Sequence, residues 1–361
     1  MDQDVLQLAS QLCHAQFGSA CRLEPLQELV AADWGRSTVW RCSLSGGAGP
    51  ETLILKQSNL GGGHGCNEAQ VLRCIRHEAL PDISMPRLLA ADEEAGLLLL
   101  GDLGEIDGNR LADLRDNMDH GSYLELLARL MEALGRFNRL HGIDNDGISA
   151  LRESSLPEDR TGHAAIHLPR LLDELPGHFA SLSIELDSPA LDELAHCRTL
   201  LADSSAHCLT HADICPSNVA LIDGRLVIYD FEVAGLRHPA IDAAWPGMRS
   251  LRCYHCTRLD SAAIRMLEGK WIEGFGLQES SAAELFSAGN LAWLATMLAW
   301  LPELLESERE RDSVPDRCRL LASLKALQGC HERHARLQGM AQSCRYMELK
   351  LAGMWPDAVA G

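Results

Sequence analysis

The spacing of hydrophobic and polar residues divides the chain into a strand-rich first part and a helical second part. Apolar residues recur at helical spacing over residues 4–17, which predicts an N-terminal helix. Short apolar runs separated by glycine- and proline-containing turns then predict five strands. The predicted strands are Leu23–Val30, Thr38–Leu44, Thr52–Lys56, Arg87–Ala91 and Leu97–Leu100. A helix is expected over residues 66–77, between the third and fourth strands.

The segment before this helix, Gly61–Gly65, contains four glycines and one histidine. Glycine frees the backbone from steric limits, so the composition favours a flexible loop. A phosphate cradle is the alternative, because backbone N–H groups in glycine-rich loops bind phosphates. The segment follows the third predicted strand and does not join the first two, and we therefore expect a loop.

From residue 101 onward the pattern is mainly helical. Gly101–Gly104 is typical of a linker, and Tyr123–Leu140 then carries leucine and phenylalanine side chains on one helical face. Leu191–Leu201 has the same period, and three or more helices are expected within residues 259–345. Residues 143–187 are rich in Pro, Asp and Ser and predict no element.

One hairpin interrupts the helical part. The apolar runs Val219–Ile222 and Leu226–Tyr229 are joined by Asp223-Gly224, a dipeptide that favours a two-residue hairpin turn. The order of elements predicts an α+β protein with two lobes, a small antiparallel-sheet lobe over residues 1–101 and a larger helical lobe over residues 102–361. A cleft between the lobes is the expected place for a ligand.

The residues that suggest chemistry flank this hairpin. His211, Asp213 and Asn218 form the pattern H-x-D-x-x-x-x-N before it, and Asp230-Phe231-Glu232 follows it. Phosphoryl transfer requires a carboxylate that accepts the proton of the attacking hydroxyl, and oxygen ligands that hold magnesium against the phosphates. Asp213 and Asn218 are five residues apart on one loop, and the hairpin returns Asp230 to the same place. We therefore predict Asp213 as the base and Asn218 and Asp230 as magnesium ligands.

A structural role is the alternative for these residues. His211 and Asp213 would then cap a loop, and Asp230 would end a strand. This alternative does not explain why all four residues occur in this order.

The segment resembles the aminoglycoside phosphotransferase and choline kinase family, which shares the protein-kinase-like fold. The resemblance covers most of residues 20–250. Pro216 in the catalytic loop also matches the family pattern, and the run His238–Ala244 is similar to the family's Pro-x-x-Asp-hydrophobic-Ala segment. The resemblance implies that Asp242, in this run, accepts hydrogen bonds from the catalytic loop. A helix N-cap is the alternative role for Asp242.

The first lobe matches the family in the same order. Lys56 ends the third predicted strand, where the family has the lysine that contacts the α- and β-phosphates, and Glu68 is placed as its partner on the next helix. The run from Gly35 to Trp40 resembles the family's nucleotide loop, in which Ser37 would cover the phosphates. Leu100 to Leu103, with Asp102 and Leu103 beyond the strand, would contact the adenine through backbone groups. The implied cofactors are ATP (or GTP) and Mg²⁺, the first lobe binding nucleotide and the second contributing the catalytic loop and substrate-binding helices.

Four departures from related patterns change the expected chemistry. Cys215 stands where aminoglycoside enzymes usually have His, and a thiol cannot neutralise charge on the transferring phosphoryl group. We therefore expect either modest turnover or compensation by a basic group elsewhere. Glu232 replaces the glycine of protein kinases. The short interval between Asp230 and Asp242 leaves no room for an activation loop, and Ala212 replaces the arginine of H-R-D. A small-molecule substrate is therefore expected rather than a peptide.

Composition excludes some partners. With 32 basic and 51 acidic residues the net charge is −19, which argues against nucleic acid as a ligand and permits a cationic substrate. The acidic start predicts no signal peptide, and the apolar stretch from Leu291 to Leu301 is shorter than a membrane span, so a cytoplasmic location is expected. Asp260 and Glu273, like other acidic residues of the later helices, are candidates to bind ammonium groups, with a solvated helix face as the alternative.

The thirteen cysteines are irregularly spaced, which favours reduced thiols over a disulfide framework. Cys253-Tyr254-His255-Cys256 and the cluster from Cys330 to His334 have residue types that bind zinc, with packed thiols and surface histidines as the favoured alternative. Trp293, Met297 and Trp300 recur at helical spacing and are expected in the core. The competing functional hypothesis is a catalytically inactive pseudokinase that binds nucleotide. The acceptor, the choice between ATP and GTP, and the oligomeric state stay open.

Overall fold

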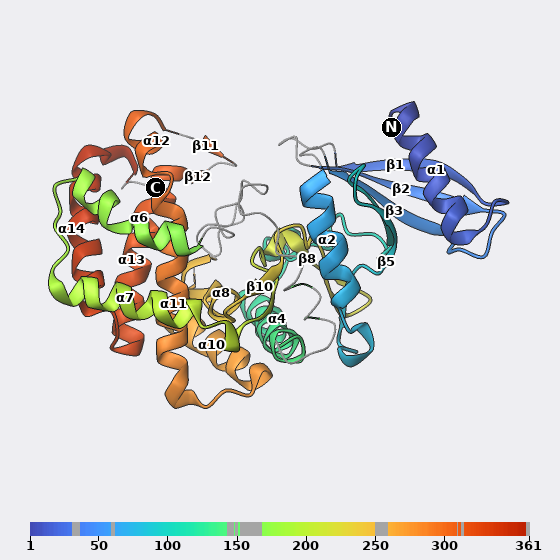
Figure 1. Cartoon of the computed structure of the whole chain (residues 1–361). Coiled ribbons are helices and arrows are strands. Elements are labelled where there is room, and N and C mark those ends of the chain that lie inside the picture. The colour runs from blue at the N-terminus through green and yellow to red at the C-terminus, as the bar shows by residue number, and fades with distance from the viewer. Residues whose placement is uncertain are drawn as a thin grey trace.

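A five-stranded antiparallel sheet forms the first lobe, in the order β1-β2-β3-β6-β5 (Figure 1). The structure is a computed structural model that describes residues 1–30, 37–58, 62–142, 148, 151, 168–249, 259–308, 310, 311 and 314–358. The strands are β1 (Arg22–Val30), β2 (Ser37–Ser45), β3 (Thr52–Ser58), β5 (Leu88–Asp92) and β6 (Leu97–Gly101). All five predicted strands are confirmed, with ends that differ by one or two residues.

Two helices cover the opposite faces of this sheet. Leu97 and Leu99 pack in one cluster with α1 (Gln3–Phe17), whereas Leu98 and Leu100 pack in another with α2 (Gly62–Cys74). Side chains alternate between the faces of a strand, so a strand buried on both faces is apolar throughout. On β3 the same alternation turns Leu53 and Leu55 toward α1 and leaves Lys56 on the face of α2.

The loop predicted over Gly61–Gly65 is wrong for its described residues. Helix α2 begins at Gly62, so Gly62–Gly65 lies in its first turns; Gly61 lies outside the described residues. Glycine costs about 1 kcal/mol per residue in a helix relative to alanine. Tertiary packing outweighs this local cost, because Ala69, Val71 and Leu72 of the same helix are buried against the sheet.

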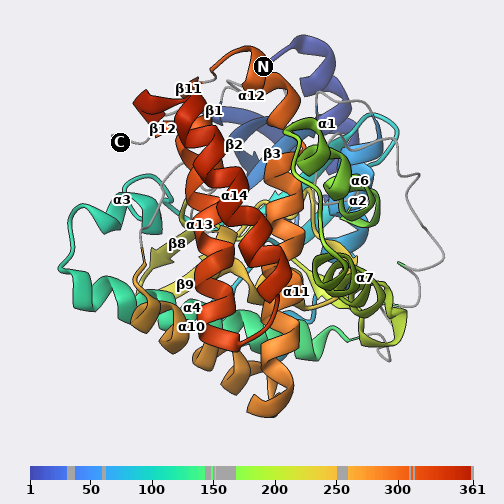
Figure 2. The same cartoon turned by 90° about the vertical axis from the view of Figure 1, so that its left-hand side faces the viewer.

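Helices build most of the second lobe, and α11, α13 and α14 lie side by side (Figure 2). The helices are α3 (Leu111–Arg115), α4 (His120–Leu140), α6 (Leu168–Ser181), α7 (Ser188–Ala202), α8 (Ala240–Ala243), α10 (Ser261–Phe275), α11 (Glu279–Leu298), α12 (Leu301–Glu306), α13 (Asp316–His334) and α14 (Gln338–Met354). Short helical turns span His77–Ala79, Ser204–Ala206, Pro216–Asn218, Trp245–Arg249 and Pro356–Ala358. Trp293 and Met297 are buried as expected, and Trp300 is partly buried. Within the described ranges no helix combines the length and apolarity needed to cross a bilayer.

Short strands connect the two parts of the molecule. The predicted hairpin is confirmed as β8 (Val219–Ile222) and β9 (Arg225–Ile228), and both turn residues, Asp223 and Gly224, have positive φ. The two-residue strand β4 (Ile83–Ser84) pairs in parallel with β9, so the sheet of the hairpin includes a segment from the first 101 residues. The remaining pairs are β7 (Cys208–Thr210) with β10 (Gly235–Arg237), and β11 (Glu310–Arg311) with β12 (Val314–Pro315).

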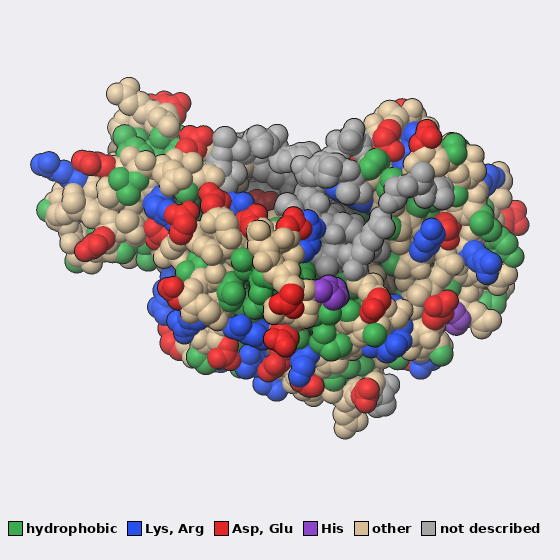
Figure 3. Space-filling view, turned by 180° about the vertical axis from the view of Figure 1, so that it is seen from behind, with side chains coloured by type: hydrophobic (Ala, Val, Ile, Leu, Met, Phe, Trp, Pro, Cys, Tyr) green, Lys and Arg blue, Asp and Glu red, His purple; other side chains and the backbone are tan. Residues whose placement is uncertain are grey.

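This arrangement confirms the predicted α+β class, with an antiparallel-sheet lobe and a larger helical lobe. Acidic and basic side chains intermingle over the face shown in Figure 3. On the described part of that face the acidic side chains form no single acidic patch.

Candidate active site

Lys56 joins the two lobes at the centre of the site. Its Nζ lies 2.7 Å from Glu68 Oε2 on α2 and 2.7 Å from Asp230 Oδ1, the residue that follows β9 by two positions. Glu232 Oε2 lies 3.9 Å from the same nitrogen. The structure thus brings Lys56 and Glu68 together with Asp230, which is 174 positions from Lys56 in the sequence.

Backbone contacts fix this group of charges. Glu68 Oε1 accepts a hydrogen bond from the N–H of Phe231 at 3.2 Å, and Asn67 Nδ2 donates to the carbonyl oxygens of Glu232 and Ala234. Helix α2 therefore holds the segment that carries Asp230. Asp230 itself has φ 66°, a backbone conformation that non-glycine residues adopt mainly where the surroundings enforce it.

Burial makes these charges depend on one another. Burial lowers the pKa of Lys56, but the carboxylates of Asp230, Glu68 and Glu232 outweigh it and keep that pKa well above its usual value. Burial also raises the pKa of Glu68, and the charge of Lys56 opposes the shift. Only 8% of Lys56 and 2% of Glu68 is exposed, so removing Lys56 would leave the Glu68 carboxylate as an uncompensated buried charge.

The loop between β7 and β8 carries Asp213 and Asn218. Asn218 Nδ2 donates to Asp213 at both the backbone oxygen, at 3.0 Å, and Oδ2, at 3.2 Å. The loop is tied to the residue before Asp230, because Tyr229 N donates to Asn218 O and His211 Nε2 lies 3.1 Å from Tyr229 O. The structure therefore places the two loop residues in contact and next to the segment of Asp230.

Asp242, on α8, fixes the start of this loop. Its two carboxylate oxygens accept hydrogen bonds from the N–H groups of His211 and Ala212, each at 2.9 Å. Asn138 Nδ2 on α4 donates to the same carboxylate at 2.8 Å. Ala212 has φ 59°, so these contacts hold a residue that would otherwise avoid the left-handed region. The N–H groups are those of another segment, so Asp242 anchors the loop and does not cap its own helix.

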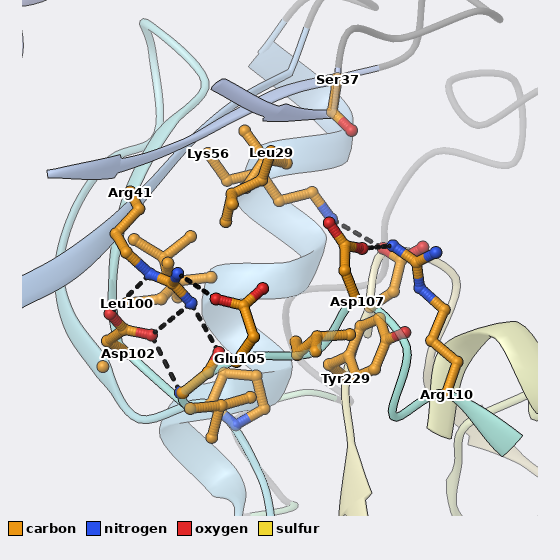
Figure 4. A pocket seen from close by; sticks show the side chains of 18 of the residues that line it. Leu29, Ser37, Arg41, Lys56, Leu100, Asp102, Glu105, Asp107, Arg110 and Tyr229 are labelled. Atoms are coloured by element: carbon orange, nitrogen blue, oxygen red, sulfur yellow. Dashed lines mark hydrogen bonds and ion pairs between the residues drawn. The ribbon is translucent and has the colours of Figure 1, made fainter. Parts of the chain in front are cut away.

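A cavity of about 190 Å³ extends from Lys56 along the face of the sheet that carries this lysine (Figure 4). Six of the predicted residues line it: Ser37, Lys56, Glu68, Asp102, Leu103 and Asp230. Within the described part of the chain, Asp213 and Asn218 lie beside this cavity and not in its lining. Gly35 and Arg36 of the predicted nucleotide loop lie outside the described residues.

Two arginines in the cavity were not predicted from the sequence. At one end, Arg41 on β2 binds both carboxylate oxygens of Asp102 and the carbonyl oxygen of Gly104 (Figure 4). Arg110 lines the cavity together with Lys56 and Asp230, and pairs with Asp107 at 2.5 Å. The alternation of side chains along β2 is the sequence signal that could have found Arg41. Arg41 is two residues from Val39, so both lie on the face of the strand that lines the cavity.

Within its described residues the structure gives no support to the other candidate sites. Cys253, His255 and Cys256 lie outside the described residues, and among the described ones no group of three His, Cys, Asp or Glu side chains surrounds a metal position. Cys330 is buried against Ser287. Asp260 caps α10 and Glu273 pairs with Lys270, which are structural and surface roles.

The family model described as the phosphotransferase enzyme family (APH) matches residues 27–253, more than half of the chain and the whole of the site. The chain belongs to this family. No curated protein sequence matches it. Among solved structures, the chain is similar to amicoumacin kinase hAmiN in complex with AMP-PNP, Ca²⁺ and Ami, with 12% identity and a TM-score of 0.52 over 93% of this chain and 95% of that one.

Two further structures show weaker similarity to the chain. Aminoglycoside phosphotransferase APH(4)-Ia has 15% identity and a TM-score of 0.49, covering 93% of this chain and 98% of that one. Choline kinase from Cryptosporidium parvum Iowa II has 10% identity and a TM-score of 0.47, covering 97% and 96%. The family match and the similarity to amicoumacin kinase hAmiN agree with the bilobed protein-kinase-like fold expected from the sequence.

The donor set of the site fits a hard divalent cation. Carboxylate and amide oxygens are the ligands that Mg²⁺ prefers, and the site offers both, from Asp230 and Asn218. Because Asn218 uses Nδ2 on Asp213, its amide oxygen is turned away from that carboxylate. A cation near Asp230 would also share a carboxylate that Lys56 already binds.

Proposed function

We propose that this phosphotransferase moves the γ-phosphoryl group of ATP or GTP onto a hydroxyl group of a small molecule. One observation supports this function above others. Lys56 Nζ lies 2.7 Å from both Glu68 and Asp230, which places a cation between the lobes at the cavity end beside the loop of Asp213 and Asn218. A lysine held in this way is suited to bind phosphates that arrive along the cavity.

Asp213 is proposed as the base. The hydroxyl oxygen of the acceptor forms a bond to the γ-phosphorus, the bond from that phosphorus to the bridging oxygen of the diphosphate breaks, and the hydroxyl proton passes to the Asp213 carboxylate. Asn218 would steady this carboxylate through the contact at 3.2 Å. Asp242 binds the N–H groups of His211 and Ala212, which precede Asp213 in the loop. The base would therefore be held in position before the reaction begins.

The remaining residues would bind the nucleotide. Lys56 would contact the α- and β-phosphates with Glu68 as its partner, and Ser37 would cover the phosphates. The backbone at Asp102 and Leu103 would meet the base at the other end of the cavity. Asn218 and Asp230 would hold Mg²⁺, which would withdraw negative charge from the phosphates when bound. The complex of amicoumacin kinase hAmiN with AMP-PNP and Ca²⁺ supports a nucleotide and a divalent cation in this fold.

The substitution Asp213→Asn tests the function. We expect it to lower product formation by about 10²–10⁴-fold, the usual contribution of a general base, while nucleotide affinity is retained. Release of ADP would be measured against a panel of amino alcohols, aminoglycosides, sugars and nucleosides. Asp223→Asn is the matched control, because it makes the same change at the hairpin turn, where Asn tolerates positive φ.

The panel also decides between an active enzyme and a pseudokinase. Nucleotide binding by the wild-type protein without product from any acceptor would favour a pseudokinase. Equal turnover of wild type and Asp213→Asn with a good acceptor would overturn the role of Asp213. A cationic acceptor is expected from the acidic balance of the chain, and the amino alcohols and aminoglycosides of the panel examine it.

A further inference from the structure

The loop from His211 to Asn218 contains no lysine or arginine. Cys215 lies two residues after Asp213 and is 6% exposed, and its Sγ lies 2.7 Å from the hydroxyl oxygen of Ser217. A buried thiol paired with a hydroxyl group contributes no positive charge. Charge that develops on a phosphoryl group in transfer is normally stabilised by a positioned cation, so another group is needed in this site.

Arg110 is placed to supply that charge. It precedes α3, and its backbone pairs with Ala220, two residues after Asn218. Leu221 N also donates to the carbonyl oxygen of Asn109 at 2.9 Å, so two backbone contacts fix the position of Arg110 against the strand that leaves the catalytic loop. The side chain lines the cavity with Lys56 and Asp230, and Figure 4 shows its guanidinium group turned toward the Lys56 end.

Polar contacts link Arg110 to the place of the missing cation. Arg110 and Tyr229 line the same cavity, and burial raises the pKa of the Tyr229 hydroxyl against the smaller, opposite effect of the guanidinium charge. This hydroxyl group donates to the carbonyl oxygen of Ser217. Ser217 is the residue that Cys215 contacts. Arg110 and a basic side chain at position 215 would therefore reach the same region. Arg110 approaches it from beyond Tyr229, and a side chain at position 215 would approach it from the loop.

We propose that Arg110 binds oxygens of the terminal phosphate of the bound nucleoside triphosphate and takes the place of the cationic residue absent from the catalytic loop. This inference rests on the proposed function. The pair with Asp107 does not prevent it, since a guanidinium group has five N–H donors and the contact with Asp107 uses one edge of it. Asp107 and Tyr229 then orient the guanidinium group, and its remaining donors point to the phosphate.

A surface ion pair is the alternative, because Arg110 and Asp107 are three residues apart and the Arg110 side chain is 33% exposed. Arg115 provides the matched control. It ends the same short helix α3, has a similarly exposed side chain at 31%, pairs with its neighbour Asp116, and does not line the cavity.

The first experiment compares the affinities of wild type, Arg110→Gln and Arg115→Gln for MgATP and for MgADP by calorimetric titration. We expect Arg110→Gln to weaken MgATP binding by about tenfold, the value of one charge-assisted hydrogen bond, and to change MgADP binding by less than about twofold. Arg115→Gln should leave both affinities unchanged. Equal losses for both nucleotides, or no loss, would overturn the assignment to the terminal phosphate.

The second experiment asks whether charge alone matters. In the Arg110→Gln background, Cys215→His places a basic side chain in the loop. It should restore at least part of the lost MgATP affinity and of the slow hydrolysis of ATP to ADP, in which water is the acceptor. A structural role for Arg110, through Asp107 or Tyr229, predicts no rescue. If the wild-type protein bound neither nucleotide, the proposed function itself would fail, an outcome distinct from normal wild-type binding with an inert Arg110.

Discussion

Asp242 shows how one buried carboxylate organises a loop that it does not belong to. It is 0% exposed and accepts hydrogen bonds from His211 N, Ala212 N and Asn138 Nδ2. Burial lowers the pKa of nearby Arg237 to about 10, and the charge of Asp242 opposes that shift. The carboxylate thus satisfies three donors and balances a buried arginine.

The substitution Asp242→Asn should therefore be costly although it changes the shape little. The amide of asparagine has one acceptor oxygen, and its NH₂ group would face N–H donors that it cannot bind. The substitution also removes the negative charge that Asp242 provides near Arg237. We expect the free energy of unfolding to fall by about 3 kcal/mol, measured by urea denaturation. Asp119→Asn, at the exposed N-cap of α4, is the control and should change little, since Asn caps as well as Asp. Equal losses in the two variants would contradict the assigned role.

Helices α4 and α10 approach so closely that only glycine fits at their contact. A Cβ atom on Gly274 would lie 2.0 Å from the carbonyl oxygen of Glu132, and one on Gly135 would lie 2.4 Å from that of Trp271. This contact positions the site, because Trp271 Nε1 donates to Asn138 Oδ1 at 3.1 Å and Asn138 in turn binds Asp242. Packing of two helices is thereby connected to the catalytic loop.

Gly274→Ala should force the two helices apart. Because the clash is with backbone, no side-chain rotation relieves it, and we expect a loss of about 2 kcal/mol in the free energy of unfolding. Turnover should fall as well, since Trp271 moves with α10. The control is Gly269→Ala in the same helix, where nothing lies within 4 Å of the added Cβ. That variant should gain up to about 1 kcal/mol from the higher helix propensity of alanine. Thermal and urea unfolding of both variants would check the opposite signs.

Local signals account for what the sequence predicted in the whole molecule. The five strands, the long helix α4 and the β8–β9 hairpin follow from periodicity and turn chemistry within each segment. The contact of Asn218 with Asp213 was predictable because five residues of one loop separate them. The approach of Lys56 to Asp230 was predicted by the resemblance to a family, and not by any local pattern.

Features that depend on distant partners were not predictable in this way. Strand β4 has two residues and gains its pairing from β9, which lies some 140 positions later. Gly62–Gly65 joins a helix because later residues of α2 are buried against the sheet. Arg41 and Arg110 have ordinary surroundings in the sequence, and their place in the cavity arises only when the lobes come together. The roles of the site residues remain predictions until the variants are measured.

His238 makes the stability of the whole molecule depend on pH in the acid range. It is 7% exposed, and burial, together with the neighbouring His207, lowers its pKa to about 4, against a weaker opposing effect of Asp203. Its Nδ1 lies 3.2 Å from the N–H of Ala240 and accepts from it, which requires an unprotonated nitrogen. The fold therefore holds this imidazole neutral, four residues before Asp242.

Between about pH 6.5, where an unfolded histidine titrates, and about pH 4, the unfolded chain binds a proton that the folded chain does not. Stability is therefore complete above this window and is lost as the pH falls through it, at up to about 1.4 kcal/mol per pH unit. Other groups also titrate there, so the test is a difference. His238→Asn retains an acceptor for Ala240 N–H and removes the proton site, and its free energy of unfolding should fall by about 2 kcal/mol less than that of wild type between pH 7.5 and 5. His196→Asn, at a side chain 61% exposed, should follow wild type. Parallel pH profiles for wild type and His238→Asn would show that acid acts on the molecule elsewhere.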